Sequence, residues 1–389
     1  MRELSDIRGE IDRIDEELTA LLCRRLDCAA QVAAYKEAHG LPVLNAERER
    51  AVIEQVRRDS EPYDTEKKGY GDANALVFAS MMDVSRALQH RQLAAGEALR
   101  QAIDGAARTL PAGGEARVVC AGRPGAFAHE AASRMFPGCA PQFVTAFTEV
   151  VEAVKRGEAD YGVLPVENSS TGSVNEVYDL IMANRLTISA AAEVPVSHCL
   201  LAKPGVCREE LRAVYSHHQA LSQCAEYIAA HELESRQYSN TAAAAEMVAL
   251  SADDSACAIA SKKAGEIYGL EIIDENIQTV IGNCTRFIAI SPKLVIPDNA
   301  DKISLLFCIP HVTGSLYRTL ARFAMEGLNL TKIESRPVRS GEFEYAFYLD
   351  FEGNLRQRGT VDLLCALSEE MPAFTFMGNY RELPPEVRP

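Results

Sequence analysis

Two cations on the first predicted helix could hold a small dianion. From Leu4 to about Lys36, apolar residues recur with the alternating three- and four-residue spacing of a long amphipathic helix. Arg25 stands where this series calls for an apolar side chain, and a buried guanidinium costs several kcal/mol unless it is paired. Lys36 lies about three turns further along nearly the same face, roughly 16 Å away along the axis. Arg25 and Lys36 could therefore close on a dicarboxylate between them.

Arg8 is a third cation on this helix, but it lies roughly 25 Å from Arg25 along the axis. That distance is too long for the two side chains to share a small ligand within one helix. If Arg8 belongs to the same site, it must come from a second chain. Taken singly, Arg8, Lys36 and Arg48 also fit surface charges or helix ion pairs, whereas the place of Arg25 in the apolar series argues for a ligand or partner.

A polar run in the middle of the chain could bind an anion. Ser169 to Gly172 lead into a predicted helix at about Asn175, so their backbone N–H groups could hold a carboxylate. The same residues also suit an ordinary helix cap. His217 and His218 fit structural or solvent-facing positions better than catalytic ones, and His198 fits a hydrogen-bonded place in the core.

Metal and disulfide chemistry have little support. Eleven cysteines are scattered singly from Cys23 to Cys365, without a Cys-x-x-Cys pair or the Cys/His spacing of a zinc site. We expect them to be small buried residues in a reducing cell. The sequence predicts no metal and no organic cofactor.

The elements that position these residues fall into three segments. The first ~95 residues are all-helical, with further helices at about Ala46–Arg58 and Ala75–Ile103, and Gly105 to Glu115 are typical of a linker. Short β-rich runs then alternate with helical stretches to about Pro292, which indicates an α/β body. From Lys302 onward, the order strand, helix, two strands, helix, strand predicts a small ferredoxin-like (βαββαβ) unit. The predicted division is a helical head at 1–95, a linker at 96–115, an α/β body at 116–293 and a tail at 300–385.

The bulk composition limits the partners and the location. In 389 residues, 40 basic and 55 acidic side chains give a net charge of −15, which disfavours nucleic acid and anionic membranes as partners. The N-terminus lacks an apolar core of signal-peptide type, and no stretch approaches the ~20 apolar residues of a membrane span. We therefore expect a cytoplasmic protein that meets anionic ligands through local clusters of Arg and Lys.

The head resembles the all-helical class of chorismate mutase. The resemblance covers about residues 4–92 and rests on IRGEID, CRRLDCA, Lys36, PVLNAERER and SRALQ. It implies three helices in an intertwined dimer, in which cations hold two carboxylates and an ether oxygen and Glu49 binds a hydroxyl. Asn45 stands where an Asp is common in the family. The implied site residues are Arg8 of the partner subunit, Arg25, Lys36, Asn45, Arg48, Glu49, Ser85 and Gln89, with Arg25, Lys36 and Gln89 acting on the reacting atoms.

The body, from about Ala116 to Ser291, resembles prephenate dehydratase through GRPGAFAHEAA, DYGVLPVENSSTGSV, YSHHQALSQC, NTAAAA and NCTRF. The resemblance implies a two-lobed fold like that of periplasmic binding proteins, with the site in the cleft between the lobes. Arg286 could bind a substrate carboxylate or belong to a structural salt bridge. The implied site residues are Thr285 as hydroxyl donor, Glu167 and Asn168 close to it, and Ser216, Gln223 and Arg286 as substrate ligands.

The tail resembles an ACT domain, a small-molecule sensor of amino-acid pathway enzymes. Its GSLY run opens the first helix of the tail, and its ESRP run ends the following strand. The resemblance implies a phenylalanine site, usually across a subunit interface. Its implied residues are Gly314, Ser315, Leu316, Glu334, Ser335, Arg336 and Pro337.

Together these resemblances predict a bifunctional enzyme of phenylalanine synthesis. It would convert chorismate to prephenate and prephenate to phenylpyruvate, with feedback inhibition by phenylalanine. We expect a homodimer, and the pairing of dimers into tetramers is left open. Two alternatives are an arogenate-preferring dehydratase whose head mainly dimerises, and a non-catalytic two-lobed amino-acid sensor.

Overall fold

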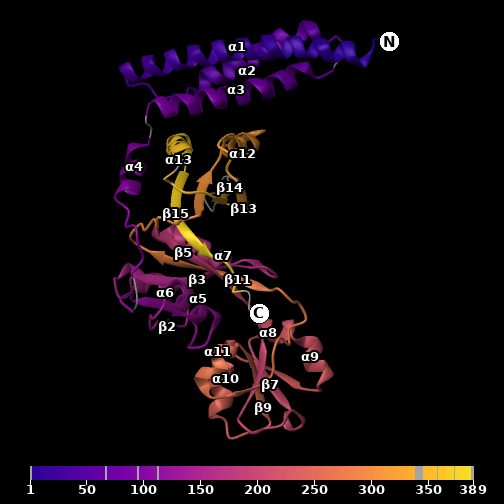
Figure 1. Cartoon of the computed structure of the whole chain (residues 1–389), viewed down its shortest axis with the longest axis vertical. Coiled ribbons are helices and arrows are strands. Elements are labelled where there is room, and N and C mark those ends of the chain that lie inside the picture. Colours follow the sequence, from indigo (N-terminus) through magenta and orange to yellow (C-terminus); the bar gives the residue numbers. More distant parts are fainter. Residues whose placement is uncertain are drawn as a thin grey trace. The chain divides into compact units, whose positions relative to one another are not determined.

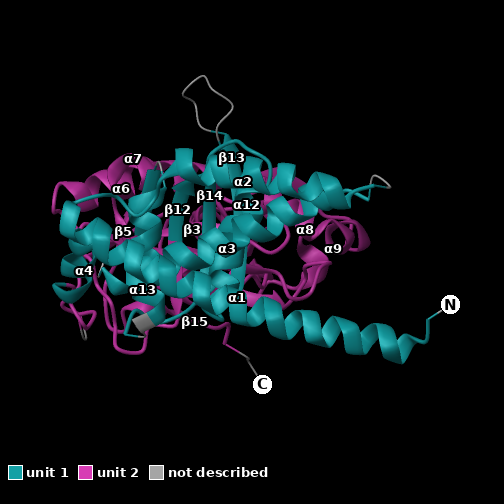
Figure 2. Ribbon diagram, turned by 90° about the horizontal axis from the view of Figure 1, so that it is seen from above, with its two compact units in different colours: residues 1–105, 305–376 teal, residues 106–304, 377–389 magenta. Residues whose placement is uncertain are grey.

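Two units make up the structure, a computed structural model that describes residues 2–65, 68–93, 96–111, 114–337, 345–356, 358–371 and 373–386 (Figure 2). Unit 1 comprises residues 1–105 and 305–376, and unit 2 comprises residues 106–304 and 377–389. The strands β12 (Lys302–Cys308) and β15 (Ala373–Leu383) have residues in both units. The predicted boundaries follow chain order, whereas this division groups the head with most of the tail.

Three helices that lie side by side form the head: α1 (Leu4–His39), α2 (Ala46–Ser60) and α3 (Tyr70–Gln92) (Figure 1). The 3-10 turn η1 (Glu61–Tyr63) follows α2. The C-terminus of α1 is capped by Gly40 in the left-handed conformation, as expected for a helix that stops at Gly. Most apolar side chains of the N-terminal half of α1 are exposed, and Ala33 is the buried residue of this helix.

The predicted third helix is wrong in its extent. It starts at Tyr70 rather than at Ala75 and stops at Gln92, and α4 (Glu97–Asp104) follows as a separate helix in the predicted linker. The interruption lies at Gly96, which has a φ of 75°. A Cβ atom at this position would lie 2.4 Å from the Cβ of Cys365, so only glycine fits here.

The tail has the predicted order of elements: β12, α12 (Ser315–Met325), β13 (Leu330–Pro337), β14 (Tyr345–Glu352), α13 (Arg358–Glu370) and β15. The four strands are ordered β13-β14-β12-β15, so β13 lies at the sheet edge. Helices α12 and α13 both contact α3 of the head. Unit 1 therefore contains direct contacts between the predicted mutase head and the predicted sensor tail.

The first lobe of unit 2 is a mixed sheet with the strand order β15-β5-β11-β3-β1-β2. Parallel pairs join β1 to β2 and β3, and β11 runs antiparallel between β3 and β5. Strand β4 pairs with β3. The elements are β1 (Val118–Ala121), α5 (Phe127–Met135), β2 (Gln142–Val144), α6 (Phe147–Lys155), β3 (Tyr161–Asn168), β4 (Gly172–Ser173), α7 (Asn175–Asn184), β5 (Thr187–Pro195) and β11 (Cys284–Ser291).

The second lobe is a five-stranded sheet with the order β10-β6-β9-β7-β8. Successive residues of β9 alternate between two core clusters, with Cys257 and Ile259 in one and Ala258 and Ala260 in the other. Both faces of the sheet are thus buried, which explains the continuous apolar run of this strand. The elements are β6 (Cys199–Ala202), η2 (Arg208–Glu210), β7 (Ala213–Ser216), α8 (His218–Gln223), α9 (Ala225–Ala230), β8 (Glu234–Gln237), α10 (Thr241–Leu250), β9 (Ala256–Ala260), α11 (Lys262–Tyr268) and β10 (Glu271–Asp274).

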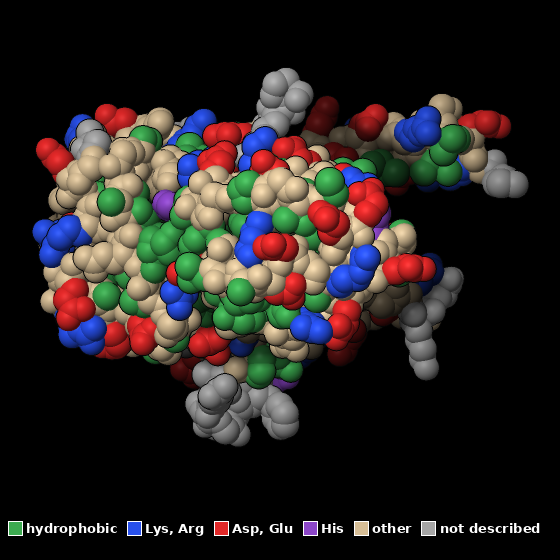
Figure 3. All heavy atoms as spheres, turned by 90° about the horizontal axis from the view of Figure 1, so that it is seen from below, with side chains coloured by type: hydrophobic (Ala, Val, Ile, Leu, Met, Phe, Trp, Pro, Cys, Tyr) green, Lys and Arg blue, Asp and Glu red, His purple; other side chains and the backbone are tan. Residues whose placement is uncertain are grey.

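The structure shows how the charged side chains, the apolar helices and the cysteines are distributed. Figure 3 shows acidic and basic side chains interspersed over the face that it draws. Within the described ranges, no helix is both long and apolar enough to cross a membrane. All eleven cysteines are free, and five of them are buried as predicted, but Cys23, Cys28 and Cys207 are exposed in the single chain.

Candidate active sites

One cavity in the head gathers the polar residues that the sequence analysis singled out. It has a volume of about 340 Å³ and is formed by α1, α2, α3 and the loop between α1 and α2. Arg8, one of the eight predicted residues, is exposed and lies about 25 Å from Arg25 along α1. The other seven line the cavity: Arg25, Lys36, Asn45, Arg48, Glu49, Ser85 and Gln89.

Hydrogen bonds orient the two cations of α1. The Nη1 of Arg25 donates to the Oγ of Ser85 at 2.9 Å, and this hydroxyl donates to the carbonyl of Met81 at 2.9 Å. The Nζ of Lys36 donates to the carbonyl of Val43. Within the described ranges, each cation makes this one hydrogen bond, and its other N–H groups can bind a dicarboxylate.

The amide side chains at this cavity have different roles. The Oδ1 of Asn45 accepts from the backbone N–H of Arg48 at 2.9 Å and so caps α2. The Nε2 of Gln89 donates to the carbonyl of Ser85 at 3.2 Å, while its buried Oε1 has no hydrogen-bond partner in the described part of the chain. An N–H group of Gln89 could face an ether oxygen only if the amide rotated and gave up its bond to the carbonyl of Ser85.

Burial and neighbouring charges set the electrostatics of the cavity. Burial lowers the pKa of Lys36 from its ordinary value of 10.5, the charge of Glu49 raises it, and the charge of Arg86 lowers it further. A dianionic ligand would favour the charged form of Lys36 and counteract this lowering.

Arg86 is a residue of this cavity that the sequence analysis missed. It is 6% exposed and forms ion pairs with Glu49 and Asp83, and also with Glu370 at 3.2 Å. The signal that identified Arg25 is present here too, because Arg86 follows Met82 by four residues on the buried face of α3. A charge at a position where the helix pattern calls for an apolar side chain again marks the site.

Strand pairing in the body places Thr285 beside Asn168. The two residues are opposite each other in the β11–β3 pair, and the Nδ2 of Asn168 donates to the Oγ1 of Thr285 at 2.8 Å. Because Thr285 accepts this bond, its own hydroxyl hydrogen remains for another acceptor.

One interpretation of the Ser169 to Gly172 run is that its backbone N–H groups hold an anion. In the structure, these N–H groups bind other parts of the protein instead. The N–H groups of Ser170 and Thr171 donate to the Oδ1 of Asn168 at 3.0 and 3.1 Å, and that of Ser169 donates to the carbonyl of Cys284 at 2.9 Å. The run forms a turn around Asn168 and fixes that side chain, rather than capping α7.

Strand alternation separates the other predicted residues of β3 and β11 from this pair. Glu167 is opposite Arg286, so the two lie on the other face of the sheet from Asn168 and Thr285. The Nε of Arg286 lies 2.5 Å from Glu382, and its Nη2 donates to the hydroxyl of Tyr380 at 2.8 Å. Of the two alternatives for Arg286, the structure shows the salt bridge.

Ser216 and Gln223 make structural contacts. Ser216 is fully buried, and its Oγ donates to the carbonyl of Ile259 at 2.6 Å. The Oε1 of Gln223 bonds the Nε2 of His198 at 2.8 Å. Burial lowers the pKa of His198, and the bond to Gln223 opposes this shift. His198 is therefore a hydrogen-bonded core histidine, as predicted.

Gln219 contacts the first lobe and was not predicted. Its Nε2 lies 3.4 Å from the Oγ1 of Thr171, which belongs to the turn around Asn168. The sequence feature that could have indicated Gln219 is its four-residue spacing from Gln223 on α8, which places both side chains on one helix face. His217 accepts from the N–H of Gln219 at 3.4 Å and caps this helix, in agreement with its predicted structural role.

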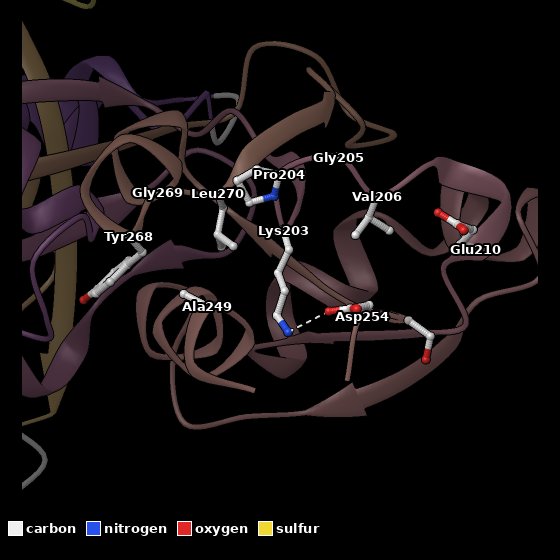
Figure 4. Close-up of a pocket in the computed structure, with 11 residues that line it drawn as sticks. Lys203, Pro204, Gly205, Val206, Glu210, Ala249, Asp254, Tyr268, Gly269 and Leu270 are labelled. Atoms are coloured by element: carbon white, nitrogen blue, oxygen red, sulfur yellow. Dashed lines mark hydrogen bonds and ion pairs between the residues drawn. The ribbon is translucent and has the colours of Figure 1, made fainter. Parts of the chain in front are cut away.

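Another cavity in the second lobe has a volume of about 600 Å³ and is lined by residues of 203–210, 249–255 and 268–270 (Figure 4). Lys203 forms an ion pair with Asp254 at 2.9 Å across it. None of the predicted site residues lines this cavity.

Comparisons with known proteins agree with both predicted families. Residues 7–90 match the family model of chorismate mutase type II, and residues 118–294 match that of prephenate dehydratase. The bifunctional chorismate mutase/prephenate dehydratase of Aquifex aeolicus (strain VF5) is 33% identical over 388 residues, which cover 98% of each chain. The chain belongs to the family of bifunctional chorismate mutase/prephenate dehydratases, enzymes of phenylalanine biosynthesis. This membership favours an enzyme over a non-catalytic sensor.

Two further relatives match the dehydratase part. Arogenate dehydratase/prephenate dehydratase 2, chloroplastic, of Arabidopsis thaliana is 38% identical over 279 residues, which cover 69% of this chain and 73% of the relative. A crystal structure of prephenate dehydratase in complex with L-Phe from Arthrobacter aurescens has 30% identity and a TM-score of 0.61, and covers 68% of this chain and 89% of that chain.

The predicted phenylalanine residues of this mutase/dehydratase lie on two elements of the tail. Gly314 has a φ of 82° and precedes the first turn of α12, which contains Ser315 and Leu316. Residues 334–337 lie on the edge strand β13. For metal binding, the described residues contain no group of three or more His, Cys, Asp or Glu side chains that could hold an ion.

Proposed function

We propose that this chain catalyses two consecutive reactions. The head rearranges chorismate to prephenate, and the body converts prephenate to phenylpyruvate, carbon dioxide and water. The observation that carries the proposal is the cavity around Arg25 and Lys36, which gathers seven residues predicted from sequence alone. The test is an assay of the purified full-length protein on chorismate and on prephenate separately. Each substrate should be consumed, and inactivity on either would contradict the proposal.

In the head, catalysis needs no nucleophile because the rearrangement is pericyclic. Arg25, Lys36 and Arg48 provide positive charge and N–H donors for the two carboxylates and for the ether oxygen, which gains negative charge as its bond breaks. Fixing of Arg25 by Ser85 keeps the donors in place before the substrate arrives. Gln89 supplies a further donor to the ether oxygen after rotation of its amide.

A second copy of the chain completes the head. Apolar side chains of the N-terminal half of α1 are exposed in the single chain, including Ile11 at 50% and Leu18 at 57%. Their burial against the same face of another α1 would be favourable by roughly 25 cal/mol per Å². Within one chain, Arg8 lies about 25 Å from Arg25 along α1. In such a dimer, Arg8 of the partner subunit would reach the cavity around Arg25.

In the body, the reaction breaks the bond between the ring and its carboxylate. The electron pair of this bond forms the new ring double bond, carbon dioxide is released, and the ring hydroxyl leaves and takes up a proton as water. Thr285, held by Asn168, keeps its hydroxyl hydrogen to donate to the leaving oxygen. A Thr hydroxyl is a weak acid, so its role is to donate a hydrogen bond or to pass on a proton.

Arogenate is a second candidate substrate for the body. The similarity to the Arabidopsis arogenate dehydratase/prephenate dehydratase supports it. A parallel assay on prephenate and arogenate at equal concentration decides between them, because the ratio of the two kcat/KM values measures the preference directly.

The tail is proposed to bind phenylalanine and to inhibit the body. The observations that support this are the ferredoxin-like order of elements, the Gly314 to Leu316 turn at the start of α12, and the similarity to a dehydratase solved in complex with L-Phe. The positive end of α12 suits the carboxylate of an amino acid. A ligand that changes activity elsewhere must bind two states of the enzyme unequally, typically by ~1 to 3 kcal/mol.

A further inference from the structure

The mutase cavity shares a wall with a second cavity of unit 1. The second cavity has a volume of about 460 Å³ and is lined by residues of α2, α3, α12 and the end of α13. Glu49, Met82 and Arg86 line both cavities. Glu49, which the resemblance to chorismate mutase implies as the ligand of a substrate hydroxyl, therefore lies against residues of the tail.

A network of charged side chains fills this wall. Three carboxylates alternate with three guanidinium groups, so the charges of these six side chains balance. Each arginine is paired with at least one acid, and four of the six side chains are at most 7% exposed. Removal of one member would leave its buried partners with fewer opposite charges to balance them. The members are Glu49, Asp83, Arg86, Arg318, Arg322 and Glu370.

Arg318 is the member that joins the tail to Glu49. Its Nε and Nη2 each donate to Asp83 at 2.8 Å, and its Nη2 lies 3.7 Å from Glu49. Asp83 and Glu49 both bind Arg86. Without Arg318, Asp83 would be paired with Arg86 alone. Asp83 would then attract Arg86 more strongly and draw it away from Glu49.

We propose that Arg318 is a positioning residue of the mutase site, which acts through Asp83 and Arg86 to hold Glu49 in place. The backbone N–H of Arg318 donates to the carbonyl of Gly314 at 2.9 Å, so the first turn of α12 and the mutase site are connected through this residue. The reaction of the head therefore depends on the conformation of the tail. This inference rests on the proposed function in one respect, the assignment of the cavity around Arg25 to chorismate.

The test uses the full-length enzyme with Arg318→Gln. The KM for chorismate should rise by roughly tenfold, within the range typical of coupled sites, while kcat changes less and prephenate turnover by the body stays normal. The double variant Asp83→Asn/Arg318→Gln removes one charge of each sign and should restore much of the KM. The matched control is Arg91→Gln, because Arg91 also joins α3 to the tail through Glu326 but, among the described residues, forms no ion pair with the six members of the network.

Three outcomes would overturn the proposal: an unchanged KM in Arg318→Gln, an equal effect of Arg91→Gln, or no recovery in the double variant. If Arg318→Gln does not fold, Arg318→Lys takes its place. It keeps the charge but cannot form both bonds to Asp83, so the KM should still rise. Normal mutase activity of Arg25→Ala would instead refute the site assignment, which separates the failure of the two proposals.

Discussion

The head and the body place their predicted residues differently. In the head, seven polar residues from α1, α2, α3 and the loop after α1 line one cavity. In the body, Thr285 and Asn168 are joined, but Glu167 and Arg286 share the other face of the sheet, and Ser216 is fully buried. Helix spacing fixes which side chains share a face over several turns, whereas the partners of a strand residue depend on register with distant strands. Motif residues are therefore safer guides to a helical site than to a site on strands.

The largest expected effect is on the head alone. Arg25→Ala should lower mutase turnover roughly 10³-fold or more, because it removes a charged donor to the reacting oxygen. Dehydratase turnover on added prephenate should stay normal. Arg24→Ala is the matched control, since this neighbour is exposed and does not line the cavity. Wild-type mutase rates in Arg25→Ala would show that the cavity is not the site.

The corresponding change in the body is Thr285→Val, which keeps the shape of the side chain and removes its hydroxyl. Turnover of prephenate should fall by at least about 10²-fold, with a smaller change in KM. Mutase activity of the same preparation is the internal control. If turnover is unchanged, the donor role belongs to another group of the body.

The third prediction concerns the proposed phenylalanine site of the tail. Gly314→Val should weaken phenylalanine binding about tenfold, because a β-branched residue is strained at a φ of 82° and the first turn of α12 would shift. Calorimetric titration of the full-length protein measures this. Gly327→Val imposes similar strain at a φ of 68° beyond the other end of α12, so equal weakening in this variant would argue against a site at Gly314.

Complementation tests whether the head site is built from two chains. An equal mixture of Arg8→Ala and Arg25→Ala proteins, after subunit exchange, should contain hybrids in half of its dimers, each with one intact site of two. Mutase activity should recover to roughly a quarter of the wild-type value. No recovery after proven exchange would indicate that each site comes from one chain.

The smallest expected effect concerns pH and the core of the body. Burial lowers the pKa of His198 below its ordinary 6.5, so the unfolded state binds a proton that the folded state excludes. Stability should therefore decline as the pH falls below about 6.5. In His198→Gln, which can still bond Gln223, the melting temperature should fall less steeply between pH 7 and 5.5. Equal slopes would contradict this contribution of His198.

Local patterns predicted the elements better than the contacts between them. The amphipathic series of α1 marked Arg25 and the approximate extent of this helix. The close packing that requires glycine at position 96 could not be read in this way, because it involves Cys365, far along the chain. The salt bridge of Arg286 likewise depends on β15, which pairs with β5. Arg86 could have been found, since it follows Met82 by four residues on α3 and holds a charge where an apolar side chain is expected, as Arg25 does on α1.

The most direct test of two reactions at two separate sites is to follow the products of both variants by chromatography. Thr285→Val supplied with chorismate should accumulate prephenate, and Arg25→Ala should form no prephenate from chorismate but convert added prephenate to phenylpyruvate. Loss of both activities in either folded variant would contradict the separation of the sites.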